Sequence, residues 1–228
     1  MSFEYEEKPS GSRFVDIVWR THDTTDGTYL AAADACWDMI FIRSVHGNRV
    51  LLSGPSSQIT PVPYRAGNRN FGIRFHRGSF LTHVPTTTMV DTTEALPMPT
   101  AESFLLAGEA WPMPTYETAD DFIAELERRE LLSDDPLVNA VLHGAPPVAP
   151  ETSVRSVQRH VAQVTGLTAN RIRQIVRARA AAERLRRGDS ILDVTHDLGY
   201  ADQAHLTRDL KRLTGYTPAR TKERDESI

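Results

Sequence analysis

The segment "TRDLKRLTGYTPAR", residues 207–220, decides the fold of the last third of this chain, because an earlier segment repeats its pattern. That earlier segment is "QRHVAQVTGLTANR", residues 158–171, which lies 49 residues upstream. Both fit Arg-x5-Thr-Gly-x-Thr-x2-Arg, with apolar residues at matching positions. Self-similarity at a fixed offset is the sequence signature of a repeated structural unit. We therefore expect two copies of one helical module.

The second copy has the pattern of two helices joined by a tight turn. Its first helix lies within residues 189–198, and Gly199 stands where a left-handed residue ends a helix. Asp202 then caps a second helix over residues 203–213, whose leucines recur at the i, i+4, i+7 spacing of a buried stripe. Two helices joined by a short glycine-containing turn predict a helix-turn-helix.

The face of the 203–213 helix opposite its leucines carries polar and basic side chains. These suit the major groove of DNA, where arginine pairs with guanine, glutamine pairs with adenine, and lysine or arginine holds phosphates. The alternative is that they are ordinary solvated side chains, which is the commoner situation for one amphipathic helix taken alone. The candidate DNA-binding residues of this helix are Gln203, Ala204, His205, Thr207, Arg208, Lys211 and Arg212.

The first copy weighs against that alternative, because capping, burial and a basic outer face all recur in it. Ser153 is the predicted cap, and the predicted buried stripe consists of Val154, Val157, Val161 and Val164. The outer face offers Arg155, Gln158 and Arg159 as further DNA-binding candidates. Each copy ends in Gly-x-Thr, so Thr168 and Thr217 are expected to cap the helices that follow, with Pro218 in a first turn.

A helix predicted over residues 169–187 connects the two copies. At 1.5 Å per residue it is roughly 28 Å long. That length is close to the ~34 Å between successive major-groove faces on one side of DNA. The spacing favours two reading helices that enter adjacent grooves, which a purely structural duplication does not require.

Residues 153–220 resemble the DNA-binding domain of the AraC/XylS family of bacterial transcription regulators, most specifically in "GYADQAHLTRDLKRLTGYTP" (199–218). The resemblance implies two helix-turn-helix units that read consecutive major grooves, preceded by a domain for effector sensing or dimerisation. By position it assigns Arg155, Gln158 and Arg159 to the first reading helix. It assigns Gln203, Ala204, His205 and Arg208 to the second.

The first copy departs from this pattern upstream of its reading helix. A complete repeat would place a supporting helix at residues 142–150, but these read "LHGAPPVAP", and prolines cannot occupy a helix interior. Either the helix that ends near His143 takes over the supporting role, or the first reading helix rests only on the connecting helix and the N-terminal domain. We expect a degenerate first unit that contributes phosphate contacts more than base readout.

The N-terminal half has the texture of a β-structure. Short apolar or alternating runs at 13–21, 36–44, 48–54 and 70–78, separated by turn residues, predict strands of a small antiparallel barrel or sandwich. A Pro/Thr-rich patch at 84–100 is expected to be loop with short helical pieces. Helices follow from Thr118 and after Asp134 or Asp135. The expected fold class is α+β: a sheet domain at 1–117, a helical linker region with a proline break at 118–150, the DNA-binding domain at 151–220 and a polar tail at 221–228.

Aromatic and arginine residues on the predicted strands are candidates for an effector pocket, although each is more commonly a core or surface residue. The pattern "CWDMIF…GP…FGIRFHRGSF" resembles, less closely than the C-terminal match, the cupin-like sensor domains that precede some AraC-type domains. Arg65 or Arg74 would hold an acidic group of the effector. The candidate set is Trp19, Trp37, Tyr64, Arg65, Phe71, Arg74 and Phe75.

Charge is divided unevenly between the two halves of the chain. Residues 151–228 have a balance of +5 and residues 1–150 a balance of −9. A basic segment joined to an acidic one favours a polyanionic partner for the basic part. Double-stranded DNA is therefore the expected partner. A small-molecule effector, RNA polymerase and a second copy of the chain are further candidates.

The sequence offers little to suggest an enzyme, a cofactor or a metal site. No phosphate-binding loop, nucleophile elbow or dinucleotide fingerprint occurs, and His76 and His83 lack the spacing of a cupin metal site. The lone Cys36, the absence of an apolar span and the acidic N-terminus predict a cytoplasmic protein. The remaining alternative is a small-molecule- or metal-binding cupin-like protein whose degenerate helix-turn-helix half serves protein interaction.

Overall fold

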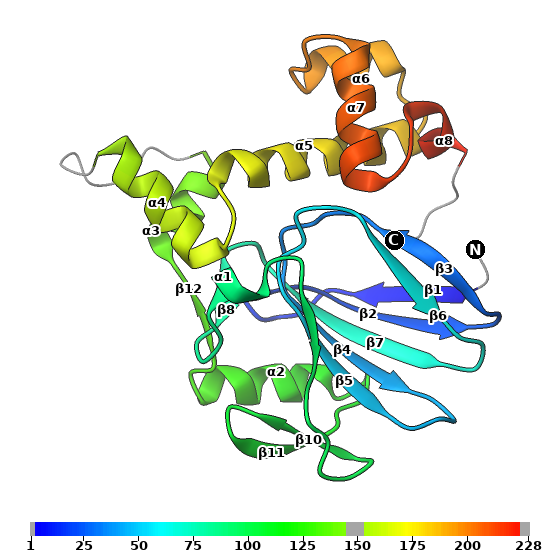
Figure 1. Ribbon diagram of the computed structural model, residues 1–228, viewed down its shortest axis with the longest axis vertical. Coiled ribbons are helices and arrows are strands. Elements are labelled where there is room, and N and C mark those ends of the chain that lie inside the picture. Colours follow the sequence, from blue (N-terminus) through cyan, green and yellow to red (C-terminus); the bar gives the residue numbers. More distant parts are fainter. Residues whose placement is uncertain (1–2, 145–152, 224–228) are drawn as a thin grey trace.

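The computed structural model describes residues 3–144 and 153–223. Figure 1 shows an antiparallel sheet domain followed by a group of helices at one end of the molecule, which confirms the predicted α+β class. The proline break after Gly144 and the tail beyond residue 223 lie outside the described residues.

The four predicted strands form the centre of a six-stranded antiparallel sheet. They are β2 (Val15–Asp23), β4 (Asp38–Arg43), β5 (Arg49–Ser53) and β7 (Arg69–Phe75). The strand order is β1-β2-β7-β4-β5-β9, where β1 (Phe3–Lys8) and β9 (Thr93–Ala95) are the edges. The two edge strands escaped prediction; β9 falls in the Pro/Thr-rich patch, together with the short helix α1 (Thr86–Met89).

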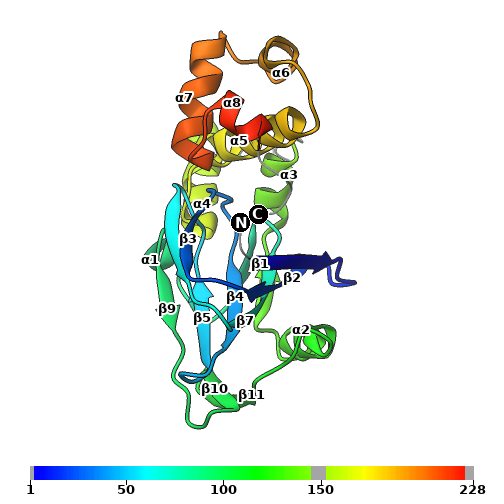
Figure 2. The ribbon, with the colours of Figure 1, turned by 90° about the vertical axis from the view of Figure 1, so that its right-hand side faces the viewer.

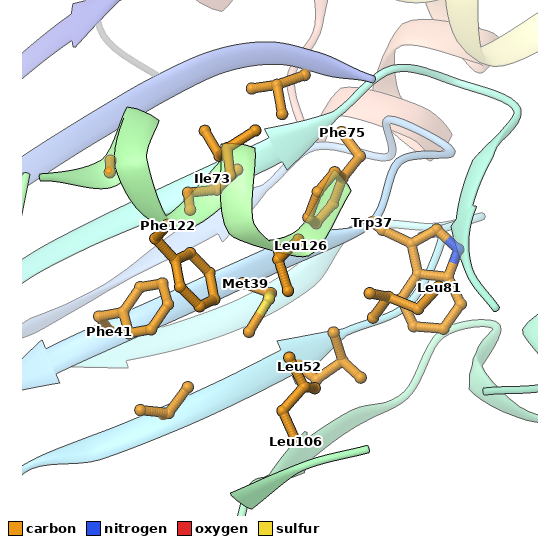
Figure 3. Close-up of a cluster of buried hydrophobic side chains, with 14 of the residues drawn as sticks. Trp37, Met39, Phe41, Leu52, Ile73, Phe75, Leu81, Leu106, Phe122 and Leu126 are labelled. Carbon is orange, nitrogen blue, oxygen red and sulfur yellow. The ribbon is translucent and has the colours of Figure 1, made fainter. Parts of the chain in front are cut away.

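One face of this sheet carries the main hydrophobic core. Alternate residues such as Met39, Phe41 and Ile73 point to it and are fully buried. Helix α2 (Ala119–Arg128) covers the face, and its Phe122 packs edge-on against Phe41 (Figure 3). The strand pair β10 (Ser103–Leu106) and β11 (Glu109–Pro112) closes the same core.

The other face of the sheet is covered by a second, two-stranded sheet. It pairs β3 (Gly27–Ala31) with β6 (Thr60–Tyr64), and an aromatic cluster of Phe3, Tyr29 and Tyr64 joins it to β1. The N-terminal domain is therefore a partly open sandwich, in keeping with the predicted sandwich or barrel. The smallest strand pair, β8 (Ser79–Leu81) with β12 (Leu132–Asp134), leads into the helices.

Helix α2 belongs to the core of the sheet domain. Its Phe122 and Leu126 are buried there, together with Ala119 and Ile123. These apolar side chains are buried within the chain, so packing inside the chain accounts for the apolar stripe of the helix. Its predicted cap also differs: Thr118 makes no capping bond, and its hydroxyl instead accepts from the Thr115 amide at 2.9 Å.

Six helices form the C-terminal part within the described residues: α3 (Pro136–Leu142), α4 (Val154–Thr165), α5 (Ala169–Arg186), α6 (Ile191–Asp197), α7 (Gln203–Thr214) and α8 (Pro218–Lys222). The predicted boundaries hold closely. The side chains of Ser153, Thr168 and Asp202 each accept a capping hydrogen bond from the backbone amide three residues later in the chain. The exception is Thr217, which makes no side-chain capping bond although Pro218 stands in the first turn of α8.

The sheet domain contacts the C-terminal helices along α5 and at the C-terminal ends of α4 and α7 (Figures 1 and 2). Ala33 and Ala35 of the sheet domain lie in one buried cluster with Ile172, Ile175 and Leu213. Within the described residues, no helix is both long and apolar enough to cross a membrane.

Candidate nucleic-acid interface

Helix α7 is held by a buried stripe and a rigid N-terminal cap. Leu206 and Leu210 are fully buried against Val194 of α6 and Leu185 of α5. The Asp202 side chain accepts from the His205 amide at 2.6 Å and so satisfies one of the free amides of the first turn. Gly199, with φ of +67°, makes the turn between α6 and α7. The predicted helix-turn-helix is present.

The outward face of α7 divides into free and engaged side chains. Gln203, Ala204, Arg208 and Lys211 are exposed, and within the described residues their side chains have no hydrogen-bond or ion-pair partner. A polar face that is solvated and free of internal partners can turn its whole hydrogen-bonding capacity to an incoming ligand. These four residues are the part of the predicted set whose side chains are free to contact a ligand.

The other three candidates on α7 have partners inside the protein. The Thr207 hydroxyl donates to the Gln203 carbonyl of its own helix. Arg212 donates to Asp209 at 2.8 Å and to Gln174 of α5 at 3.2 Å. His205 is half-buried, edge-on to the Tyr200 ring. Their placement favours a structural role, which the amphipathic pattern alone did not distinguish.

Asp209 is the hub of this engaged group. It is 6% exposed and accepts from Arg177 of α5 at 3.2 Å, while the His205 ring lies 3.6 Å away. The Arg177 guanidinium in turn lies 4.1 Å from the centre of the Tyr200 ring. A buried carboxylate with several charged partners fixes the orientation of the helix that carries it. Asp209 and its partners therefore fix the angle at which α7 packs against α5.

Helix α4 presents the three predicted candidates of the first copy. Arg155, Gln158 and Arg159 are all exposed and, within the described residues, their side chains have no hydrogen-bond or ion-pair partner. Val157 and Val161 are buried as predicted, but Val154 is 72% exposed, so its place in the buried stripe was wrong. The reason is that the packing partner of α4 meets the middle of the helix and not its first turn.

That partner is α3, which supports α4 from the side opposite its exposed face. Val138 is fully buried in one cluster with Val157, Val161 and Ala169. Asp135, the cap of α3, also accepts from His160 of α4 at 2.8 Å. Of the two alternatives that the sequence left open, the structure has the first: the helix that ends before His143 supports α4.

Helix α5 sets the distance between the two reading helices. It spans 18 residues, or about 27 Å, so the predicted length holds. Its interior is lined with alanine and isoleucine, which allows helices on both sides to approach closely. In Figure 1, α4 and α7 lie at opposite ends of α5.

A cavity of about 270 Å³ lies between the six-stranded sheet and the β3–β6 pair. Of the seven predicted pocket residues, Trp19, Tyr64 and Arg74 line it. The larger share of its wall comes from residues that sequence reasoning missed, which are Phe3, Tyr5, Thr21, Asp23, Tyr29, Ile40, Ile42, Arg49, Leu51, Val62, Pro63, Asn68 and Asn70.

The other four predicted pocket residues lie elsewhere. Trp37, Phe71 and Phe75 are buried in the core on the opposite face of the sheet, and Arg65 is exposed in the turn after β6. Successive residues of a strand point to opposite faces, so Phe71 and Phe75 cannot share a cavity with Arg74 of the same strand. The strand alternation, applied strictly, could have separated these two groups.

The Nε of Arg74 is engaged by two carboxylates. Its guanidinium lies 3.3 Å from Asp34 and 3.2 Å from Asp38, both buried carboxylates. Burial raises the pKa of Asp38 to about 6, although Arg74 counteracts this. Burial likewise raises the pKa of Asp23, which accepts from Asn70 at 3.0 Å. Arg74 lines the cavity and Arg65 does not, and the binding of an acidic group by either residue stays a prediction.

Within the described residues, no group of three or more His, Cys, Asp or Glu side chains is arranged to hold a metal ion. His76 instead lies 3.7 Å from Asp16, and Cys36 is buried with a pKa raised to about 12 by desolvation.

Comparison with known proteins agrees with the geometry of the C-terminal helices. A family profile described as "Helix-turn-helix domain" matches residues 150–224. No curated protein matches the sequence. Among solved structures, ToxT from Vibrio cholerae in a P21 crystal form is similar, with a TM-score of 0.46, 10% identity and coverage of 98% of each chain. A second structure, of ToxT from Vibrio cholerae O395, has a TM-score of 0.43, 10% identity and coverage of 97% of each chain. The profile match assigns residues 150–224 to a helix-turn-helix domain of the AraC type, a DNA-binding module of transcription regulators.

Proposed function

We propose that the protein reads a specific DNA sequence mainly through α7 and holds the duplex through α4, under the control of an effector bound in the sheet domain. The observation that carries the proposal is the free face of α7. Gln203, Arg208 and Lys211 are exposed and unpaired, while the rest of the helix is locked by Asp209 and its partners. A rigid helix with free base-reading side chains loses little entropy on binding.

The role given to α4 follows from its weaker support. Its first turn is exposed at Val154, and its supporting helix α3 meets only the middle of α4. A less constrained helix holds its side chains less accurately for base readout, but long arginines still reach phosphates. Arg155 and Arg159 are accordingly assigned to backbone contacts.

The sheet domain is given the sensing role because both reading helices end on it. Gly166, after α4, is packed against Val90 and Thr86, and Gly215, after α7, against Leu30. A change in the sheet domain would reach the spacing of both helices at once. Dimerisation through this domain and contact with RNA polymerase remain further proposals that no residue singles out.

Fluorescence anisotropy tests the division of labour, using duplexes selected from random DNA by the full chain. Arg208→Ala should lose discrimination between selected and random duplexes by about tenfold, whereas Arg155→Ala should weaken both duplexes equally. Arg69→Ala is the control, because this arginine is exposed on the sheet domain and its side chain has no hydrogen-bond or ion-pair partner among the described residues. The opposite assignment of effects would refute the proposal, as would an affinity that does not fall as salt rises.

A further inference from the structure

We propose that the cavity between the β3–β6 pair and the six-stranded sheet takes a small organic cation, an amine or quaternary ammonium that carries one apolar or aromatic group. This deepens the proposed sensing function, on which it rests, by naming the chemical class of the effector. The sequence had suggested an acidic effector, and the arrangement of the cavity argues for the reverse.

The cavity walls are unusually aromatic. Phe3, Tyr29 and Tyr64 meet with ring centroids 5.6–6.3 Å apart, and Tyr5 adds a fourth ring from β1. On the sheet side, Trp19 lies over Gly72, its cross-strand partner, where an added Cβ would fall 2.3 Å from the indole. The missing side chain at Gly72 thus lets the indole lie flat and line the cavity. Aromatic faces carry partial negative charge, and several of them together attract a cation.

The charges inside the cavity have the same preference. Asp23 lines it and is only 2% exposed. Asp38 lies directly behind the wall, where it accepts a hydrogen bond of 3.3 Å from the Trp19 indole. Arg74 is a half-buried cation of the wall, and it is shared between Asp38 and Asp34. Within the described residues, Asp23 has no ion-pair partner, whereas Arg74 has two.

The remaining charged group of the wall lies at the edge. Arg49 stands at the start of β5, where its residue is exposed to solvent. Water and salt screen an exposed charge far more than a buried one. The charge of Arg49 is therefore screened more than that of Asp23, and the charge of Arg74 is already shared between Asp34 and Asp38 through its Nε.

Burial disfavours the ionised form of the two aspartates at the cavity. It raises the pKa of Asp23 and of Asp38, although Arg74 lowers that of Asp38. A cation placed among the rings would lower both pKa values and stabilise the ionised forms.

The size of the cavity limits the ligand. At about 270 Å³ it lies just below the range of roughly 300–1,000 Å³ usual for ligand sites. A single ring with a compact ammonium group fits this description, whereas long acyl chains and nucleotides do not. Benzyltrimethylammonium is a suitable probe, and neopentylbenzene is its uncharged isostere.

Isothermal titration of the full chain with three probes tests the inference: benzyltrimethylammonium, neopentylbenzene and phenylacetate. Benzyltrimethylammonium should bind at least about tenfold more tightly than either of the others. Asp23→Asn, which keeps the hydrogen-bond acceptor, should weaken the cation on the order of tenfold and leave neopentylbenzene unchanged. Tyr29→Leu should also weaken the cation. Asp121→Asn is the matched control, since Asp121 is exposed on α2 at the other face of the sheet.

Each other outcome overturns the inference. Tighter binding of phenylacetate would show that the cavity prefers an acid. Equal binding of the cation and its isostere would show that the cavity recognises only the apolar group. No heat with any probe would show that the cavity binds none of these ligands. Titration of the same preparations with duplex DNA separates this inference from the proposed function. Cation binding without DNA binding would contradict only the proposed DNA-binding function. DNA binding without cation binding would contradict only the assignment of a cationic effector.

Discussion

The backbone amide of Ala33 donates a hydrogen bond of 2.9 Å to the carbonyl oxygen of Leu213, in the last turn of α7. The carbonyls of a last helical turn lack partners within the helix, and here the sheet domain supplies one. The next residue, Asp34, pairs with Arg74 in the cavity wall. One short loop between β3 and β4 therefore touches both the cavity and the end of the principal reading helix.

The end of α4 is held in a similar way. Gly166 has φ of +72° and faces Val90, while Gly215 has φ of +85° and faces Leu30. An Arg171 guanidinium at the start of α5 also donates to the Ser57 carbonyl of the sheet domain. The duplicated Gly-x-Thr exits thus have a second use besides ending helices: each is a contact between the two parts of the molecule.

Substitution of the exit glycines should loosen this contact. In Gly166→Ala the new Cβ would lie 2.3 Å from Val90, and in Gly215→Ala it would lie 2.8 Å from Leu30. We expect each variant to lose about 2–4 kcal/mol of unfolding free energy, of which about 1 kcal/mol is the left-handed backbone and the rest is steric overlap. Urea unfolding measures the loss.

The control is Gly199→Ala, because Gly199 has a similar φ of +67° but nothing within 4 Å of an added Cβ. It should lose only the backbone part, about 1 kcal/mol. Equal losses at all three glycines would show that the exits do not press on the sheet domain.

Asp209 and Lys211 should separate stability from DNA affinity. Asp209→Ala leaves Arg177 without its buried carboxylate partner and should cost about 2–3 kcal/mol of stability. Lys211→Ala removes an exposed, unpaired side chain, so stability should change by less than about 0.5 kcal/mol. Its DNA affinity should fall with a decrease of about one in the salt slope. Chemical unfolding and anisotropy at several salt concentrations distinguish the two; a stability loss at Lys211 equal to that at Asp209 would contradict this division.

The helices were predictable because the residues that begin and end them act on backbone groups nearby in the sequence. Ser153, Asp202, Gly166 and Gly215 act through their own backbone neighbours, so residue type and spacing sufficed. The strands were predictable only in the middle of the sheet. β6 carries Pro61 and Pro63, which argue against a strand, yet it pairs only with β3 and so has an edge free of ladder bonds.

The candidate sites show the same boundary between local and long-range information. The free face of α7 follows from helical periodicity, but the partners of His205 and Arg212 come from α5 and from Asp209, and no spacing within α7 reveals the contact with Gln174. For the cavity, the sequence showed which residues are aromatic but not on which face of the sheet each of them lies. Tyr29 was missed because its wall belongs to a two-stranded sheet that only tertiary packing places over β1.

Asparagine variants of Asp38 and Asp135 should differ from the wild type in unfolding free energy, and these two differences should change with pH in opposite directions. The pKa of Asp38 is raised by burial to about 6 in the folded protein, against 3.8 unfolded. The folded state therefore binds more protons between these values, and Asp38 lowers stability progressively as pH rises from about 4 to 6. Asp38→Asn should gain on the wild type over this window by on the order of 1–3 kcal/mol, added to a pH-independent loss of the pair with Arg74.

Asp135 is the opposite case. Burial raises its pKa, but hydrogen bonds from the Val138 amide and from His160 outweigh it, so the pKa is lowered overall. Its contribution to stability is present above its unfolded pKa and is lost as pH falls through the folded one. Asp135→Asn should therefore lose ground on the wild type as pH rises. Urea unfolding from about pH 2.5 to about pH 7 should show Asp38→Asn gaining on the wild type between about pH 4 and 6, and Asp135→Asn losing ground as pH rises from about 2.5 to 4. Changes of the same sign in both windows would contradict the assignment.

The last prediction concerns the supporting helices of the two units. Val138 of α3 and Val194 of α6 are both fully buried, each against the reading helix of its own unit. Truncation to alanine removes the same two methyl groups in each, and should cost about 1–3 kcal/mol of stability at both sites. A negligible cost at Val138 would show that α3 does not support α4.

Their effects on DNA should differ, although the chemical change is identical. Val194→Ala loosens α7 and should reduce discrimination between selected and random duplexes. Val138→Ala loosens α4 and should reduce affinity for both duplexes alike, because phosphate contacts carry no sequence information. Anisotropy measured well below the unfolding temperature keeps both variants folded. If Val138→Ala removed discrimination as strongly as Val194→Ala, the first unit would be reading bases, and its assignment to phosphate contacts would be wrong.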